Sequence, residues 1–77
     1  MNILEKFKDI LVEQLNVEPG DIAENSTLAA DLGADSLDIV EIAMAVEEEF
    51  EVQLSAEEVE KLNTVADWVE LIGEKLG

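Results

Sequence analysis

The residues best suited to chemistry stand in the middle of the chain, where Gly33, Ala34 and Asp35 lead into Ser36. An apolar pattern of helical spacing starts directly after the serine, at Leu37. A serine hydroxyl acts as a nucleophile when a neighbouring histidine or lysine takes its proton. The chain has no histidine, and none of its four lysines follows a serine at S-x-x-K spacing. The sequence therefore argues against a serine hydrolase and leaves two roles for Ser36: a helix cap, or a hydroxyl offered to another enzyme.

Carboxylates are the most abundant reactive groups of the chain. Twenty acidic residues stand against four lysines and no arginine, which gives a formal net charge of −16. No two carboxylates are set apart by their spacing, so the sequence does not indicate acid–base catalysis. The run from Asp31 to Asp35 resembles the start of an EF-hand loop, but Ser36 stands where that loop needs glycine and Ile42 where it needs glutamate. We expect no specific metal site, only loosely held cations that relieve charge repulsion.

This charge also limits the partners that the protein can bind. A strongly negative surface repels nucleic acid and anionic membranes, whereas it attracts basic protein surfaces. The chain has no cysteine, which excludes disulfides and cysteine metal sites. Its first ten residues include charges and lack the apolar core of a signal peptide, and no apolar run is long enough to span a bilayer. We expect a protein of a reducing, aqueous compartment without stable membrane association.

The elements that must position Ser36 are helices. The length predicts one domain, residues 1–77, with a single core. Apolar residues recur at helical spacing in four segments: residues 2–15, 36–50, 55–62 and 64–76. Asn2, Ser55 and Thr64 are suitable N-cap residues at the starts of three of them. No segment alternates at the period of a strand, so the sequence predicts an all-α fold: a small four-helix bundle with a short third helix and a long loop between helices one and two.

That long loop, residues 16–35, is unusual for so small a domain unless it is anchored or functional. Pro19 and Gly20 predict a turn, and residues 27–32 predict a helical turn that ends at Gly33. Four apolar residues recur through the loop and are expected to anchor it to the core: Val17, Ile22, Leu28 and Leu32. An anchored loop that leads to one helix start indicates that this helix start has a function.

The predicted helix after Ser36 has two apolar arcs. One arc is an ordinary core-facing stripe: Ile39, Ile42, Ala43, Val46 and Phe50. A second arc lies roughly 140° away on the helical wheel. It combines three apolar residues with three carboxylates: Leu37, Val40, Met44, Glu41, Glu47 and Glu48. These six residues, the second arc, are either isolated surface residues or an apolar patch with an acidic rim that docks basic proteins.

The residues from Leu32 to Asp38, followed by Val40 and Glu41, read LGADSLD-x-VE. This run resembles the prosthetic-group attachment motif of the acyl carrier proteins, and the likeness extends over the whole chain. It resembles most the free-standing carriers of dissociated (type II) fatty-acid synthesis. The resemblance implies that a phosphopantetheinyl transferase attaches 4′-phosphopantetheine from coenzyme A to Ser36, with Asp35 and Asp38 beside it. The thiol of that arm would carry acyl chains as thioesters, so the protein would be a carrier and not an enzyme.

The resemblance also assigns two further regions. The second arc would be recognised by basic patches on the partner enzymes: the phosphopantetheinyl transferase, an acyltransferase, a ketosynthase, a ketoreductase, a dehydratase and an enoyl reductase. The acyl chain would enter the bundle past residues that otherwise form an ordinary core: Phe7, Leu28, Ile39, Val46, Leu62, Val65, Trp68 and Ile72. The resemblance further implies a monomer of the bacterial cytoplasm, or alternatively of a plastid stroma after removal of a transit peptide.

Two features depart from the family pattern. Leu54-Ser55 stands where many members have Ile-Pro, but Ser55 and Glu58 form a capping-box pattern that can equally start the third helix. Trp68 is unusual, and its bulk would shorten or reshape the acyl pocket. Polyketide and D-alanyl carrier proteins are alternatives within the class. Outside it, the alternative is an acidic cation-binding protein in which Ser36 only caps a helix.

Overall fold

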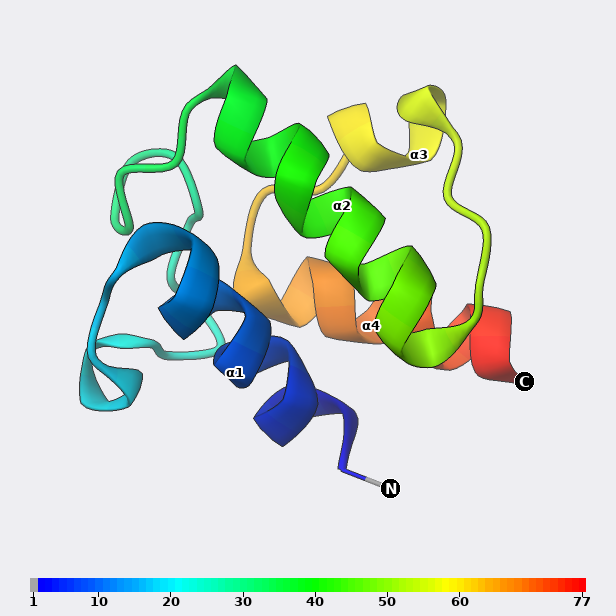
Figure 1. Ribbon diagram of the computed structural model, residues 1–77, viewed down its shortest axis with the longest axis horizontal. Helices are drawn as coiled ribbons and strands as arrows, with labels where there is room; N and C mark the ends of the chain where they lie inside the picture. Colours follow the sequence, from blue (N-terminus) through cyan, green and yellow to red (C-terminus); the bar gives the residue numbers. More distant parts are fainter. Residues whose placement is uncertain (1) are drawn as a thin grey trace.

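The computed structural model describes residues 2–77 as helices joined by loops (Figure 1). In chain order the elements are α1 (Ile3–Leu15), the 3₁₀ helix η1 (Pro19–Asp21), α2 (Ser36–Phe50), α3 (Ala56–Glu60) and α4 (Val65–Leu76). Within residues 2–77 the β pairing is limited to one isolated bridge between Thr27 and Thr64. The predicted all-α fold, with a short third helix and a long first loop, is confirmed. No helix in this part of the chain is long and apolar enough to cross a membrane.

Each α-helix begins at a side chain that satisfies a backbone N–H of the first turn. Asn2 Oδ1 accepts a hydrogen bond of 3.1 Å from the Glu5 N–H, as predicted for α1. The other three helices begin with capping boxes, in which two side chains each accept from the other residue's N–H: Asp35 with Asp38, Ser55 with Glu58, and Thr64 with Asp67. The helix starts follow from these local pairs, which is why they could be located in the sequence.

Helix α3 is shorter than predicted, because it ends at Glu60 and not near Leu62. The Lys61 N–H is shared between the carbonyls of Glu58 and Val59, and the Leu62 N–H bonds to Val59 O at 3.1 Å. The chain therefore tightens into 3₁₀-type turns at this point. None of the five residues of α3 is fully buried, so little packing holds the helix in place.

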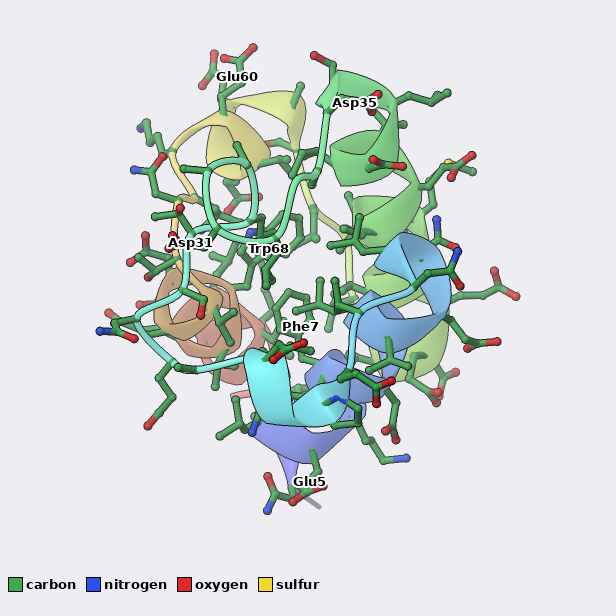
Figure 2. All side chains as sticks on the ribbon, turned by 90° about the vertical axis from the view of Figure 1, so that its left-hand side faces the viewer. Glu5, Phe7, Asp31, Asp35, Glu60 and Trp68 are labelled. Atoms are coloured by element: carbon green, nitrogen blue, oxygen red, sulfur yellow. The ribbon has the colours of Figure 1, made fainter. Side chains whose placement is uncertain are left out.

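The core lies between α1, α2 and α4. Figure 2 shows Phe7 and Trp68 in the interior of the molecule. Their rings stack with centroids 5.4 Å apart and planes inclined by 20°, a favourable arrangement for an aromatic pair. The largest fully buried side chains are Trp68, Phe7, Leu11, Leu28, Ile42, Ile72, Val46 and Val65. The predicted core stripe of α2 is confirmed at its centre, where Ile42 and Val46 are inaccessible to solvent.

The loop between α1 and α2 is anchored, as predicted. Ile22, Leu28 and Leu32 are buried, and Val17 packs against the core. Three backbone hydrogen bonds fix the loop to the start of α4: Leu28 N to Asn63 O, Val65 N to Ser26 O, and Ala66 N to Glu24 O. The predicted turn at residues 27–32 is present, and Gly33 follows it with a left-handed φ of 75°. The loop therefore delivers the chain to the start of α2 in one defined position.

Candidate functional site

The start of α2 presents Ser36 at the surface. Asp35 is the N-cap: its Oδ1 accepts from the Asp38 N–H at 2.9 Å, and Asp38 Oδ2 accepts from the Asp35 N–H at 3.2 Å. Ser36 is therefore the first helical residue, and it is exposed. Of the two roles left open by the sequence, the cap belongs to Asp35 and not to Ser36. In Figure 2, Asp35 marks this helix start at the periphery of the molecule.

The backbone at this helix start offers hydrogen-bond donors to a phosphate group. The first backbone N–H groups of a helix have no intrahelical partner and carry partial positive charge, which favours anions there. The capping box uses the N–H groups of Asp35 and Asp38. The N–H groups of Ser36 and Leu37 remain at the first turn without an intrahelical acceptor. These two N–H groups can donate hydrogen bonds to the oxygens of a phosphate group, beside the carboxylates of Asp35 and Asp38.

The apolar members of the second arc lie on the surface of α2. Leu37, Val40 and Met44 are 65%, 54% and 59% exposed. Exposure of one such residue is ordinary, but three along one helix face form a patch. A groove of about 260 Å³ runs beside this patch, between α2 and α3, and its lining is mostly apolar: Val40, Ala43, Met44, Glu47, Leu54, Ala56 and Val59. The contribution of α3 to this groove was not predicted, because it depends on tertiary packing.

The three carboxylates of the second arc differ in their surroundings. Glu41 Oε2 accepts from Gln14 Nε2 of α1 at 2.8 Å. Glu47 is half-buried, and its Oε2 accepts from the Leu54 N–H at 2.9 Å, which fixes the connection between α2 and α3. Glu48 is exposed. The carboxylates therefore combine structural and surface roles, a distinction that the helical wheel does not contain.

A second pocket, of about 420 Å³, lies between the α1–α2 loop, α2 and α3. Its lining comes from three parts of the chain: Thr27, Leu28, Ala29, Ala30, Ile39, Val59, Glu60, Leu62 and Asn63. Leu28, Ile39 and Leu62 were predicted as acyl-pocket residues, and the structure brings these three together. The other five predicted residues do not line it and lie in the core instead: Phe7, Val46, Val65, Trp68 and Ile72.

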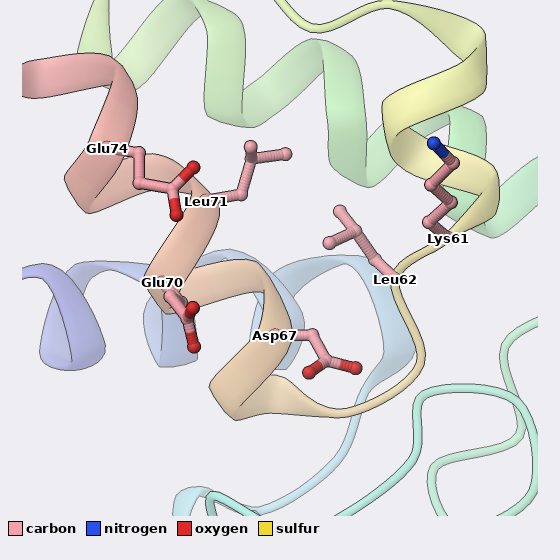
Figure 3. A pocket seen from close by; sticks show the side chains of 6 residues that line it. All are labelled: Lys61, Leu62, Asp67, Glu70, Leu71 and Glu74. Carbon is pink, nitrogen blue, oxygen red and sulfur yellow. The ribbon is translucent and has the colours of Figure 1, made fainter.

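A third hollow, of about 400 Å³, lies beside α4 (Figure 3). Its lining is largely charged: Lys61, Leu62, Asp67, Glu70, Leu71 and Glu74. Asp67 has a structural task, because hydrogen bonds from the Thr64 and Asn63 N–H groups hold the pKa of its carboxyl below the usual value. Within residues 2–77, no group of three or more potential ligands is arranged to hold a metal ion. We assign no function to this hollow.

The fold and site are those of a small all-α protein with an exposed serine at the acidic start of its second helix. Residues 5–72 match the family model described as phosphopantetheine attachment site. Curated relatives named acyl carrier protein share about half of their residues with the chain. The relative from Wolinella succinogenes is 50% identical over 72 residues, which cover 94% of this chain and 95% of the relative. Relatives from Zymomonas mobilis and Campylobacter curvus are 53% and 49% identical over 91% and 100% of this chain, and over 90% and 99% of their own lengths.

The chain therefore belongs to the acyl carrier protein family. It is a carrier and not an enzyme, and its prosthetic group is covalently bound 4′-phosphopantetheine. These findings confirm the resemblance drawn from the LGADSLD motif. They also fit the absence of histidine from the chain, because a carrier that is not an enzyme needs no catalytic base.

Proposed function

We propose that Ser36 Oγ is the atom to which 4′-phosphopantetheine is attached. The observation that carries this proposal is that Asp35 caps α2, which leaves an exposed serine as the first helical residue. In the transfer, Ser36 Oγ forms a bond to the phosphorus that bears the pantetheine in coenzyme A. The bond from that phosphorus to the bridging oxygen breaks, and adenosine 3′,5′-bisphosphate leaves. A base of the transferase takes the proton of the hydroxyl.

Asp35 and Asp38 have supporting roles in this proposal. Asp35 uses only Oδ1 in the capping box, so Oδ2 is available to a metal ion that the transferase holds with coenzyme A. Asp38 accepts from the Asp35 N–H and so keeps the residue before the serine in its extended conformation. After transfer, the N–H groups of Ser36 and Leu37 and the helix dipole stabilise the phosphodiester.

The second arc and the groove beside it form the docking face for partner enzymes. Leu37, Val40 and Met44 supply an apolar centre, and methionine adapts to partners of different shape. Glu48 and the exposed Glu41 supply negative charge, which steers basic surfaces and makes association dependent on salt. Glu47 contributes charge while it holds the α2–α3 connection. The partners are the phosphopantetheinyl transferase and the acyltransferase, ketosynthase, ketoreductase, dehydratase and enoyl reductase that act on the acyl chain.

The pocket between the loop, α2 and α3 receives the acyl chain. Leu28, Ile39 and Leu62 give it an apolar wall, and burial of methylene groups there favours insertion. Its position beside α2 suits a chain that is attached at the start of that helix. The five deeper residues of the predicted pocket act as its floor and yield only as the bundle expands, because a permanent cavity in the core would be costly.

The pathway is the dissociated synthesis of fatty acids in a bacterial cytoplasm, with the protein acting as a monomer. The named relatives are bacterial acyl carrier proteins, and the high negative charge disfavours self-association at low salt. Polyketide and D-alanyl carriers have the same prosthetic group, so enzyme assays with each partner class separate the pathways.

The mass of the intact protein tests the attachment site. The chain is incubated with coenzyme A, magnesium and a phosphopantetheinyl transferase of broad specificity, and a gain of one phosphopantetheine is expected. Ser36→Ala should gain nothing. Ser55→Ala is the matched control, because Ser55 is the exposed cap of α3, and it should be modified like the parent chain. Modification of Ser36→Ala, or none of the folded parent chain, would overturn the proposal.

A further inference from the structure

The Trp68 indole N–H has no hydrogen-bond partner, although the residue is only 1% exposed. It is the one buried side-chain nitrogen or oxygen within residues 2–77 without a partner. Leaving a buried donor unpaired is destabilising, and an unpaired group in a native fold requires an explanation. The indole ring alone would fill the same space against Phe7, so packing explains the ring but not the polar group.

Trp68 does not line the proposed acyl pocket, but backbone hydrogen bonds link it to residues that do. Thr64 lies one helical turn before Trp68, and its carbonyl accepts the Trp68 N–H of the backbone at 3.3 Å. Asn63 precedes Thr64 and lines the pocket, and its carbonyl holds the Leu28 N–H at 3.1 Å. Leu28, which forms part of the pocket wall, and Trp68 belong to the same buried cluster. Figure 2 shows Trp68 in the interior of the molecule. The loop that carries Asp31 passes on one side of it in this view, and Phe7 of α1 lies on another.

We infer that the Trp68 indole N–H donates a hydrogen bond to an oxygen carried on the acyl chain itself. This inference rests on the proposed function, because it requires an acyl chain that enters the bundle from Ser36. A chain that extends from the pocket past Leu28 into the core would enter the buried cluster that contains Trp68, whose donor is already desolvated. The chain thereby supplies the acceptor that the protein lacks, and Trp68 becomes a residue that determines cargo specificity.

The chemistry of the unpaired group selects one class of cargo, the oxoacyl chain. A keto oxygen only accepts hydrogen bonds, so one indole N–H satisfies it. A hydroxyl also brings its own donor, which would be left unpaired among the apolar residues of the core. A saturated chain leaves the indole unpaired. We therefore expect the order of preference oxoacyl, then hydroxyacyl and saturated acyl, at equal chain length.

The single tryptophan of the chain makes the test direct. The protein is loaded on Ser36 from acyl coenzyme A thioesters. One sample carries an octanoyl chain, and the others carry octanoyl with a keto group on carbon 3, 5 or 7. Intact mass confirms loading before any other measurement. The indole N–H then gives one side-chain signal of its kind in a ¹⁵N–¹H NMR spectrum. With at least one oxo chain, this indole signal should lie further downfield than it does with octanoyl. Its proton should also exchange more slowly with solvent than in the octanoyl form.

Trp68→Phe is the matched variant, because it retains an aromatic ring opposite Phe7 and removes the donor. Unfolding equilibrium constants of the oxo-loaded and octanoyl-loaded forms are compared in both proteins by denaturant titration. The ratio of the saturated to the oxo unfolding constant should be larger in the parent than in Trp68→Phe by roughly 5- to 150-fold, the effect of leaving a buried partner unsatisfied. The NMR test on the parent chain stands even where the variant does not fold.

Two results would overturn the inference. The first is an indole signal that is unchanged with every oxo chain. The second is an octanoyl chain that shifts the signal as far as the oxo chains do, because the acceptor is then not the keto oxygen. Failure of loading at Ser36 would instead overturn the proposed attachment site. The mass measurement separates these two failures, because it reports loading and not the contact at Trp68.

Discussion

The division of labour between Asp35 and Ser36 leads to a prediction about stability. Asp35→Ala removes the 2.9 Å hydrogen bond to the Asp38 N–H and one half of the capping box. Loss of an N-cap destabilises a protein by about 1 kcal/mol, within a range of about 0.5–2 kcal/mol. In a domain of this size, 1 kcal/mol corresponds to a fall in Tm of roughly 4–8 °C. Ser36→Ala removes no capping bond, so its free energy of unfolding should stay within about 0.5 kcal/mol of the parent value.

The assay is urea unfolding followed by far-ultraviolet circular dichroism and by the fluorescence of Trp68, the single tryptophan. Asp35→Asn is the matched control, because asparagine caps a helix about as well as aspartate but carries no charge. It should retain most of the stability that Asp35→Ala loses. The double variant Asp35→Ala/Ser36→Ala should lose more than the sum of the single effects, because Ser36 is the residue able to replace the missing cap.

Equal destabilisation by Ser36→Ala and Asp35→Ala would refute this reasoning, since it would mean that the serine hydroxyl holds the helix start. A neutral Asp35→Ala would refute it as well. The result therefore bears on function: a serine that contributes nothing to stability is free to serve as an attachment point.

Four further outcomes follow from the charges and contacts. Millimolar magnesium should raise the Tm relative to low salt, because cations screen a net charge of −16; an unchanged Tm would contradict the importance of self-repulsion. Glu48→Lys should slow turnover by partner enzymes at unchanged stability, and unchanged kinetics would count against the docking face. Glu47→Ala should lower stability as well as turnover, because it removes the oxygen that accepts from the Leu54 N–H at 2.9 Å; calorimetry of the Glu47 and Glu48 variants compares them. The contribution of Glu58 and Asp67 to stability should fall in acid: hydrogen bonds lower the pKa of Glu58, chiefly from Lys75, and of Asp67, chiefly from Thr64, below the ordinary values of 4.5 and 3.8. Carboxyls with lowered pKa stabilise the fold above their ordinary pKa and lose that effect as pH falls through the lowered values, so Asp67→Asn should flatten the acid limb of a pH–Tm curve.

The helices could be predicted because their signals are local. Asn2, Asp35, Ser55 and Thr64 each act within three residues of their own position, and apolar spacing marks the faces between them. The end of α3 was wrong by about two residues. The helix ends at Lys61, whose N–H donates to two carbonyls at once. A lysine at that position does not predict such a hydrogen bond.

The site was predictable where it depends on a motif and not where it depends on tertiary contacts. The position of Ser36 follows from the residues around it. The pairs Gln14–Glu41 and Leu54–Glu47 join residues 27 and 7 positions apart, so no local pattern indicates that these two carboxylates accept hydrogen bonds. The apolar stripe of α4 indicates that Trp68 is buried, but the lack of a partner for its N–H depends on every side chain around it.

Helix α3 connects the two regions proposed to receive partners and cargo. Val59 lines both the groove beside the second arc and the pocket that contains Leu28. No residue of α3 is fully buried, and a partly exposed ion pair of 2.8 Å between Lys75 and Glu58 joins it to α4, a contact of the kind that contributes little to stability. Because α3 contributes a wall to both the groove and the pocket, a movement of α3 that changes the shape of one also changes the shape of the other. On the proposed function, a partner that enters the groove and displaces α3 would therefore also reshape the pocket, and binding of the enzyme and retention of the acyl chain would not be independent events.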